Sequence, residues 1–230
     1  MGWFTKFITS SLRQKLVMSL TGLFLILFLC VHLYGNMQLF RNDEGFAYNA
    51  FTKFMVHNPL IEAIAYLLYI FILLHSIQGI ALWIQNRRSR GPNAYAVKVT
   101  KTTGTNSFAS RNMAFLGLLI FVFLGIHMGD FWWAMKNEAI PSIVHADGLE
   151  YQNMYLMVEE SFSQGWIVIV YVLSMVGLFF HLLHGFQSAF QTLGINHTKY
   201  TPFIKVLGWV YSIVVPLAFA AMPIYYYFFK

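Results

Sequence analysis

Histidine is the residue type in this chain that is best able to do chemistry. Eight histidines occur in 230 residues, and five lie within strongly apolar stretches: His32, His75, His127, His181 and His184. An ionisable side chain inside a membrane-spanning helix costs about 2.5 kcal/mol or more, so its presence there indicates a function. A single such histidine often serves only packing. One on each of four successive apolar stretches favours bis-histidine ligation of haem iron.

Five apolar stretches must position these histidines, and each is long enough to cross a bilayer, which takes about 20 helical residues. They cover residues 17–39, 60–84, 113–135, 166–190 and 204–228. The composition agrees, because 58% of the residues are hydrophobic and only 10% are charged. We therefore expect one all-α integral membrane domain over residues 1–230, whose first four helices form a di-haem bundle. The first stretch is too long for a cleaved signal peptide, so it is expected to remain in the membrane.

The charged residues predict how the chain is oriented. Eleven of the 15 Lys and Arg residues flank the spans on the side of the N-terminus, and all nine acidic residues lie on the other side. Basic residues are enriched in cytoplasmic loops, so we expect the N-terminus inside and the C-terminus outside. The net charge of +6 is then a topology signal, and no nucleic-acid partner is expected. The loop 136–163 is predicted to contain a short helix, and residues 1–13 an interfacial helix.

The depths of the histidines sort four of them into two levels. His32 and His127 lie about three residues past the centres of their spans toward the outside, roughly 5 Å at 1.5 Å per residue. His75 and His181 lie a similar distance toward the inside, because their helices run the other way. We therefore expect each level to bind one haem iron between two imidazoles. The two irons should differ in depth by about 10 Å, which suits electron transfer across the membrane.

Two histidines in the fourth span compete for the inner iron. Gly185 follows His181 by four residues, as Gly79 follows His75, and residues at i and i+4 share a helix face. A glycine one turn from a ligand leaves room for a flat macrocycle, so we predict His181 as the ligand. His184 is then expected to contact a haem propionate or the fifth span. The other two ligands also have glycines nearby, Gly35 and Gly129.

This pattern resembles the di-haem cytochrome b subunit of succinate dehydrogenase and fumarate reductase (complex II). The resemblance covers nearly the whole chain. It rests on one histidine in each of the first four spans, on Ser19-x-Thr21-Gly22, and on His181-x-x-x-Gly185. The stretches His32-Leu-Tyr-Gly-Asn, His57-Asn-Pro59 and His127-Met-Gly-Asp-Phe-Trp are similar to the version found in anaerobic and related bacteria. The implied location is a bacterial cytoplasmic (inner) membrane.

The resemblance implies electron transfer between a membrane quinone, menaquinone by family likeness, and an iron–sulphur subunit on the inner face. A flavoprotein subunit then interconverts succinate and fumarate, so the chain is part of an enzyme but has no substrate chemistry of its own beyond quinone redox. The implied cofactors are two haem b groups, with His75 and His181 on the inner iron and His32 and His127 on the outer. Candidates for propionate contacts are Arg13, Ser19, Arg111 and His184.

The quinone site is the least defined part of this interpretation. The family often places it near the outer haem, where a quinone needs an apolar slot, hydrogen-bond donors and a proton acceptor. Residues at about that depth are Asn36, His57, Glu62, Asp130 and Trp133, which can equally be polar anchors at span ends. Some family members carry a glutamate two residues before the ligand of the fourth span. This chain has Phe179 there, which makes a proton path at that point doubtful.

Two other functions fit parts of the pattern. A five-helix cytochrome b of another quinone-linked enzyme, such as respiratory nitrate reductase, also binds two haems, but its ligands cluster on two helices rather than four. A transporter with a histidine proton relay is the non-redox alternative. Transporters usually show inverted repeats and interrupted helices near the midplane, and neither is clear here, although the last span contains Pro216 and Pro223.

Overall fold

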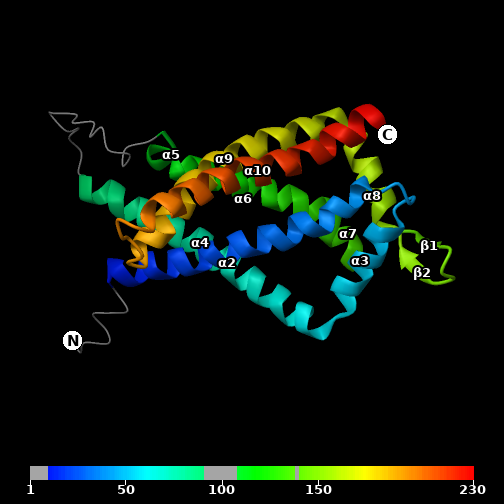
Figure 1. Ribbon diagram of the computed structural model, residues 1–230, viewed down its shortest axis with the longest axis horizontal. Helices are drawn as coiled ribbons and strands as arrows, with labels where there is room; N and C mark the ends of the chain where they lie inside the picture. The colour runs from blue at the N-terminus through cyan, green and yellow to red at the C-terminus, as the bar shows by residue number, and fades with distance from the viewer. Residues whose placement is uncertain (1–9, 91–107, 138–139) are drawn as a thin grey trace.

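The computed structural model describes residues 10–90, 108–137 and 140–230, and five long helices dominate this part of the chain (Figure 1). Their bounds are α2 (Ser11–Asn36), α4 (Pro59–Arg90), α6 (Met113–His127), α9 (Gly165–Thr192) and α10 (Thr201–Phe229). A π-helical turn, η2 (Met128–Trp133), and the short α7 (Ala134–Lys136) continue α6, and α5 (Phe108–Arg111) precedes it. All five are long and apolar enough to cross a membrane, which confirms the five predicted spans. Most of the predicted interfacial helix lies outside the described residues.

The long helices begin and end at residues with recognisable capping chemistry. The Ser10 hydroxyl accepts a hydrogen bond from the Arg13 amide at 3.3 Å and so caps α2. Gly194, with φ at +77°, ends α9 in the left-handed conformation that glycine adopts without strain. Pro202 stands in the first turn of α10, where its missing amide hydrogen is not needed. Local sequence therefore fixes where the spans start and stop.

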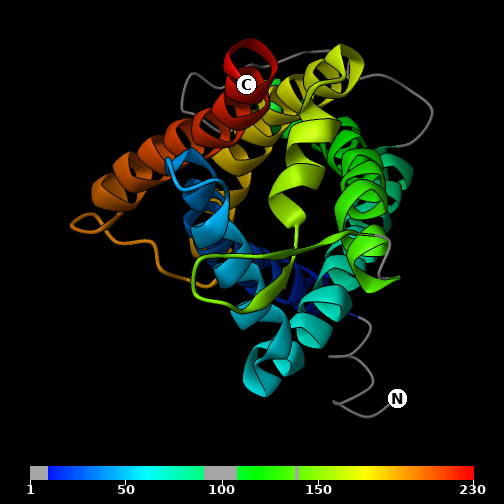
Figure 2. The same cartoon turned by 90° about the vertical axis from the view of Figure 1, so that its right-hand side faces the viewer.

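Four of the helices pack as a ring. Neighbours around it are α2 and α4, α4 and α6, α6 and α9, and α9 and α2. The diagonal partners, α2 with α6 and α4 with α9, do not pack closely. Helix α10 lies outside the ring, chiefly against α9 and also against α2 (Figures 1 and 2). The ring therefore has a central axis that two diagonal pairs of helices face.

One end of the bundle carries additional short elements, and we call it the cap end. These are η1 (Met37–Phe40), α3 (Phe46–His57), α8 (Met154–Phe162) and the antiparallel strands β1 (Ser142–Val144) and β2 (Glu150–Gln152) (Figure 1). Helix α8 confirms the short helix expected between residues 136 and 163. The sequence analysis predicts neither α3 nor the hairpin, and the two strands are an exception to the all-α expectation.

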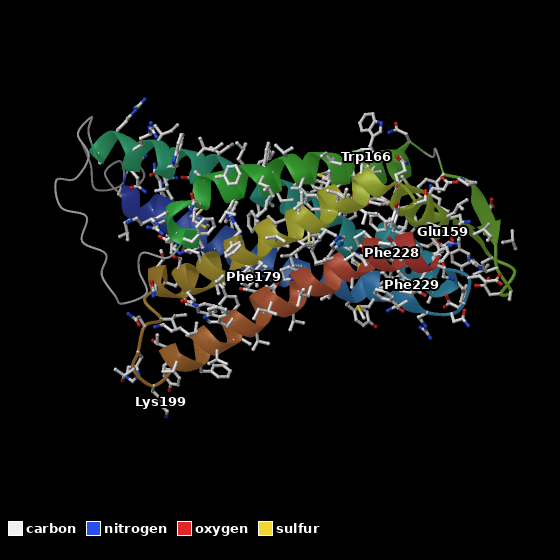
Figure 3. All side chains as sticks on the ribbon, turned by 90° about the horizontal axis from the view of Figure 1, so that it is seen from above. Glu159, Trp166, Phe179, Lys199, Phe228 and Phe229 are labelled. Atoms are coloured by element: carbon white, nitrogen blue, oxygen red, sulfur yellow. The ribbon has the colours of Figure 1, made fainter. Side chains whose placement is uncertain are left out.

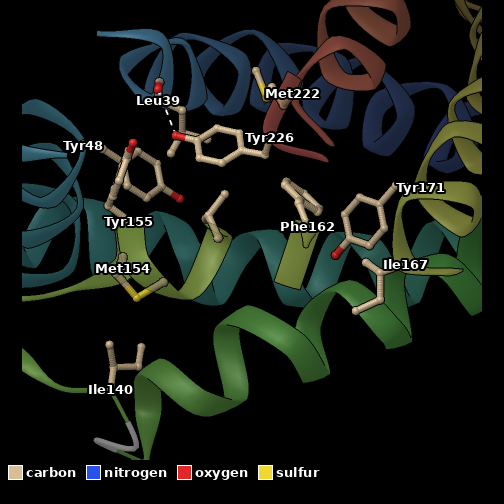
Figure 4. Packing of buried hydrophobic residues seen from close by; sticks show 11 residues of the cluster. Leu39, Tyr48, Ile140, Met154, Tyr155, Phe162, Ile167, Tyr171, Met222 and Tyr226 are labelled. Atoms are coloured by element: carbon tan, nitrogen blue, oxygen red, sulfur yellow. Dashed lines mark hydrogen bonds between the residues drawn. The ribbon is translucent and has the colours of Figure 1, made fainter. Parts of the chain in front are cut away.

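The cap end also holds the larger hydrophobic core (Figure 4). Its buried members come from α8, α9, α10 and the short elements. The Tyr226 hydroxyl of α10 donates to the Leu39 carbonyl of η1 at 2.9 Å, a bond drawn in Figure 4. A Cβ on Gly35 would lie 2.4 Å from a ring carbon of Phe51. Gly35 therefore allows α3 to approach α2, and Phe51 fills the space beside this glycine.

Candidate functional site

The rings of His32 and His127 meet across one diagonal of the helix ring, in the half nearer the cap end. Their centroids are 5.7 Å apart and their planes lie at 83°. His32 comes from α2 and His127 from the last position of α6. Because these two helices do not pack closely, the two imidazoles bridge the gap between them. We call them the cap-side pair.

The rings of His75 and His181 meet across the other diagonal, from α4 and α9. Their centroids are 6.2 Å apart and their planes lie at 60°. We call them the distal pair. The structure thus brings the four histidines together in the combination that their depths in the sequence predict.

Both distances suit two imidazoles on opposite sides of one iron. A metal–imidazole bond is roughly 2 Å long and the ring centre lies about 1 Å further, so two axial rings have centroids about 6 Å apart. Among the described residues, no group of three or more His, Cys, Asp or Glu is placed to hold a bare metal ion. A macrocycle supplies four nitrogens itself and needs only two axial ligands. The donor set of each pair therefore fits haem better than a free cation.

Hydrogen bonds on His75 leave one of its nitrogens available to a metal. The Thr21 hydroxyl lies 3.2 Å from His75 Nδ1 and also donates to the Val17 carbonyl at 2.8 Å. Since its single proton is used on the carbonyl, its oxygen accepts from the Nδ1–H of His75. The proton is then on Nδ1, and Nε2 has a free lone pair. A ligating histidine is usually oriented in this way.

Tyr171 plays a corresponding part for His127. Its hydroxyl lies 3.3 Å from His127 Nδ1, and it also interacts with the Asp130 side chain. A hydroxyl oxygen can accept a hydrogen bond, so Tyr171 is placed to accept from the Nδ1–H of His127. Asp130 lies in the π-helical turn η2, and its Oδ2 is buried without a hydrogen-bond partner in the described part of the chain. Such turns occur frequently at functional sites.

The two histidines of α9 have different surroundings. His181 Nδ1 is buried and has no hydrogen-bond partner among the described residues, which is costly unless another group satisfies it. A Cβ on Gly117 would lie 3.9 Å from His181 Cε1, and a Cβ on Gly185 would meet nothing within 4 Å. His184 Nε2 instead lies 3.1 Å from the Ser188 hydroxyl of its own helix. The geometry favours His181 as the partner of His75.

The residues predicted to contact haem propionates differ in whether they have a hydrogen-bond donor available. Arg13 has a buried Nε without a partner among the described residues. The Ser19 hydroxyl donates to the Lys15 carbonyl at 2.9 Å, so its proton is already used. Arg111 is exposed at the end of α5. Arg13 is therefore the best-placed of these donors for a buried carboxylate.

The quinone candidates are spread over the cap end. Asn36 donates to the His32 carbonyl at 2.8 Å, so it lies beside the cap-side pair, as Asp130 does. Glu62 and His57 are exposed, and Trp133 is 63% exposed. The structure thus leaves Asn36 and Asp130 as the two candidates beside the cap-side pair.

Sequence reasoning missed Trp132, Tyr171 and Gly117. Trp132 Nε1 is buried without a partner in the part of the chain that the structure describes, and its ring lies 5.8 Å from that of Tyr69. No spacing rule reveals these residues, because each acts on a side chain from another helix. The sequence analysis names Thr21 only as part of the Ser19-x-Thr21-Gly22 motif and predicts no function for its hydroxyl.

Phe179 lies midway along α9, far from Lys199 at one end of the bundle and from Glu159 at the other (Figure 3). The centroid of its ring lies 4.8 Å from that of Phe180.

A comparison with protein-family models, with curated proteins and with solved structures finds no match to this chain.

Proposed function

We propose that this chain is a membrane cytochrome b that transfers electrons between a quinone and the iron–sulphur subunit of a succinate dehydrogenase or fumarate reductase. The observation that carries the proposal is the pair of histidine contacts at 5.7 and 6.2 Å, each across a diagonal of one helix ring. Two b haems, when bound, supply one-electron carriers at two depths in the bilayer.

The residues of the chain have separable tasks in this function. Four imidazoles would hold the two haem irons, and Thr21 and Tyr171 orient two of these imidazoles through Nδ1. Glycines beside the distal pair keep side chains away from it, since a Cβ on Gly22 would lie only 3.2 Å from His75 Cε1. Arg13 supplies a buried donor for a propionate carboxylate.

Quinone oxidation and reduction also need proton transfer. Asp130 has a buried oxygen without a partner and Trp132 a buried N–H without one, both among the described residues of η2. An acceptor and a donor so close to the cap-side pair suit the two oxygens of a quinone ring. We therefore place the quinone site at η2, with Asp130 as the proton acceptor.

The first experiment counts haem. The chain is purified in detergent, its pigment is extracted, and non-covalent haem b is measured per polypeptide. Two haems per chain are expected, with two midpoint potentials in a redox titration, because the surroundings of the two pairs differ. Absence of haem b from a chain that is still folded by circular dichroism would contradict the proposal.

The second experiment tests the partners. The chain is expressed with an affinity tag in its native host, and proteins that co-purify are identified by mass spectrometry. A flavoprotein and an iron–sulphur protein with succinate or fumarate activity are expected. Two haems together with subunits of a different quinone-linked enzyme would keep the cytochrome assignment and exclude complex II.

A further inference from the structure

A cavity of about 500 Å³ lies at the cap end, between α3, the tip of α7 and the hairpin. Figure 2 looks onto this end of the molecule. The walls combine polar and apolar surface and include Lys53, His57, Lys136 and Glu150, with Met135 among the apolar members. The haem and quinone assignments above use none of the cavity's charged groups, so its chemistry needs a separate explanation.

The cavity has a net positive charge, because its two lysines outnumber the one acidic residue of the lining, Glu150. Lys53 and Lys136 come from segments far apart in the sequence, and neither forms an ion pair within the described residues. The Lys53 ammonium donates to the Glu150 carbonyl at 2.8 Å and lies 4.5 Å from the centre of the Tyr151 ring. Neutral groups thus hold Lys53 in place, and an ammonium with three donors keeps two of them available.

The cavity also presents hydrogen-bond acceptors. The Nδ1–H of His57 donates to the Lys53 carbonyl at 2.9 Å, because a carbonyl can only accept. Neutral His57 therefore has Nε2 as an acceptor. The Thr52 hydroxyl donates to the Asn49 carbonyl at 2.9 Å, so its oxygen can still accept. The walls therefore combine two cations with two groups that accept from hydroxyls.

The cavity lies at the depth where lipid headgroups are expected. Lys136 is the last residue of the third span and follows Trp133, which is 63% exposed. Phe54 of α3 is 58% exposed. Aromatic side chains of this kind mark the boundary between hydrocarbon and headgroups, and basic pockets at that level recognise phosphate.

We propose that this cavity binds the headgroup of an anionic glycerophospholipid, with Lys53 and Lys136 on the phosphate and His57 and Thr52 on glycerol hydroxyls. The carboxylate of Glu150 in the same wall disfavours a second negative charge. A phosphodiester carries one charge at neutral pH, whereas inorganic phosphate carries between one and two. The charge balance of the cavity therefore favours the lipid. The proposal does not depend on the haem assignment.

The test measures which lipid stays with the purified full-length chain and its partner subunits. The protein is equilibrated in mixed micelles of phosphatidylglycerol and phosphatidylcholine and washed in detergent, and retained lipid is counted by mass spectrometry. About one phosphatidylglycerol per chain is expected. The variant K53Q/K136Q should lower this retention at least about tenfold, because each lysine near a membrane surface contributes roughly fivefold. Phosphatidylcholine retention should not change.

The matched control is R41Q/K230Q, which removes the same charge at the same end without altering the walls of the cavity. It should retain phosphatidylglycerol as the wild type does, and so should K53R/K136R. Equal losses in K53Q/K136Q and R41Q/K230Q, or no loss in either, would overturn the proposal. If the double variant does not fold, K53Q and K136Q are measured singly, and a loss of less than about twofold in both would overturn it.

A competition arm separates the two sources of phosphate. Inorganic phosphate at millimolar concentration is added during the wash, at constant ionic strength. Retention that is unchanged supports a lipid site. Displacement of phosphatidylglycerol, together with saturable binding of labelled phosphate, would overturn the lipid assignment in favour of free phosphate.

Discussion

The two histidine pairs have the same composition but very different surroundings. The cap-side pair lies among aromatic rings, whose centroids are between 5.2 and 6.0 Å from one or other imidazole: Phe28, Phe123, Phe131, Tyr171 and Phe219. The distal pair makes only one of the described ring contacts, the one between its own two members. Its neighbours are instead the Thr21 hydroxyl and two glycines, Gly22 beside His75 and Gly117 beside His181.

This difference shows that one kind of histidine pair can be positioned in two ways. Around the cap-side pair, close packing of rigid rings restricts the imidazoles, and the large core beside it adds support. Around the distal pair, packing is uneven, because α9 contributes buried Leu178 and Leu182 whereas Leu68 is the one described residue of α4 in the buried core. There, a hydrogen bond and the small size of glycine determine the position of the ring. Substitutions should therefore affect the two pairs by different mechanisms.

The largest expected effect is the loss of one haem on removal of one ligand. H181A should lower the haem content from two to one per chain, and H127A should do the same for the other site. H184A is the matched control on α9 and should retain both haems, because His184 bonds to Ser188 of its own helix. The measurement is the pyridine haemochrome assay on purified chain. Loss of a haem in H184A but not in H181A would reverse the ligand assignment.

The second effect tests the role of glycine at the distal pair. A side chain at Gly22 must begin 3.2 Å from His75 Cε1, closer than most such contacts, so G22L should displace the imidazole. We expect loss of the distal haem and retention of the cap-side haem, seen as one remaining midpoint potential. The control L20F adds bulk to the same helix at a residue that is 51% exposed. Two unaltered potentials in G22L would show that the glycine is not needed for ligation.

The third effect is a shift in potential when a hydrogen bond is removed. T21V and Y171F each delete the acceptor for one Nδ1–H, which makes the imidazole a weaker donor to ferric iron. One hydrogen bond contributes about 1 kcal/mol, and 1.4 kcal/mol corresponds to about 59 mV for one electron. We expect a rise of about 40 mV in one potential per variant. Each variant is the control for the other, and a shift of both potentials in both variants would argue against separate sites.

The smallest effect concerns the hairpin of the cap. A hydrogen bond from the Tyr151 hydroxyl lowers the pKa of the Asp147 carboxyl below its usual value of 3.8. The stabilisation is present above that value and is lost as the pH falls through the lowered pKa. The protection factors of the hairpin amides in hydrogen exchange, taken relative to the intrinsic rate at each pH, should therefore fall below about pH 4, and the haem content should not change. D147N should abolish this pH dependence of exchange.

The spans and the pairing of histidines could be predicted because the thickness of the bilayer relates a residue's position along a helix to its depth in the membrane. The depth of His32 or His75 follows from counting residues, and equal depth selects the partner. How each helix is rotated about its axis does not follow, because spans that are apolar on all sides lack a clear polar face. That is why the contacts of Thr21 and Tyr171 emerge only in the structure.

Irregular backbone also limited what could be predicted from the sequence. The π-helical turn at η2 alters the direction of the side chains that follow His127, and no proline or glycine pair in the sequence marks it for certain. Gly35 illustrates the same problem, because the ring that requires it, Phe51, belongs to α3, which was not predicted. Both features depend on short elements at the cap end that lack a strong hydrophobic period.

The diagonal arrangement of the ligands has a consequence for how the protein is made. Each pair joins one helix from the first 90 residues with one from beyond residue 107, so under the proposed ligation neither haem can bind both of its histidines until α6 or α9 has been synthesised. The cap-side site is complete once α6 is inserted, whereas the distal site must wait for α9. Under the proposed ligation, the cap-side site is therefore complete before the distal site, and each bound haem would link an early helix to a later one.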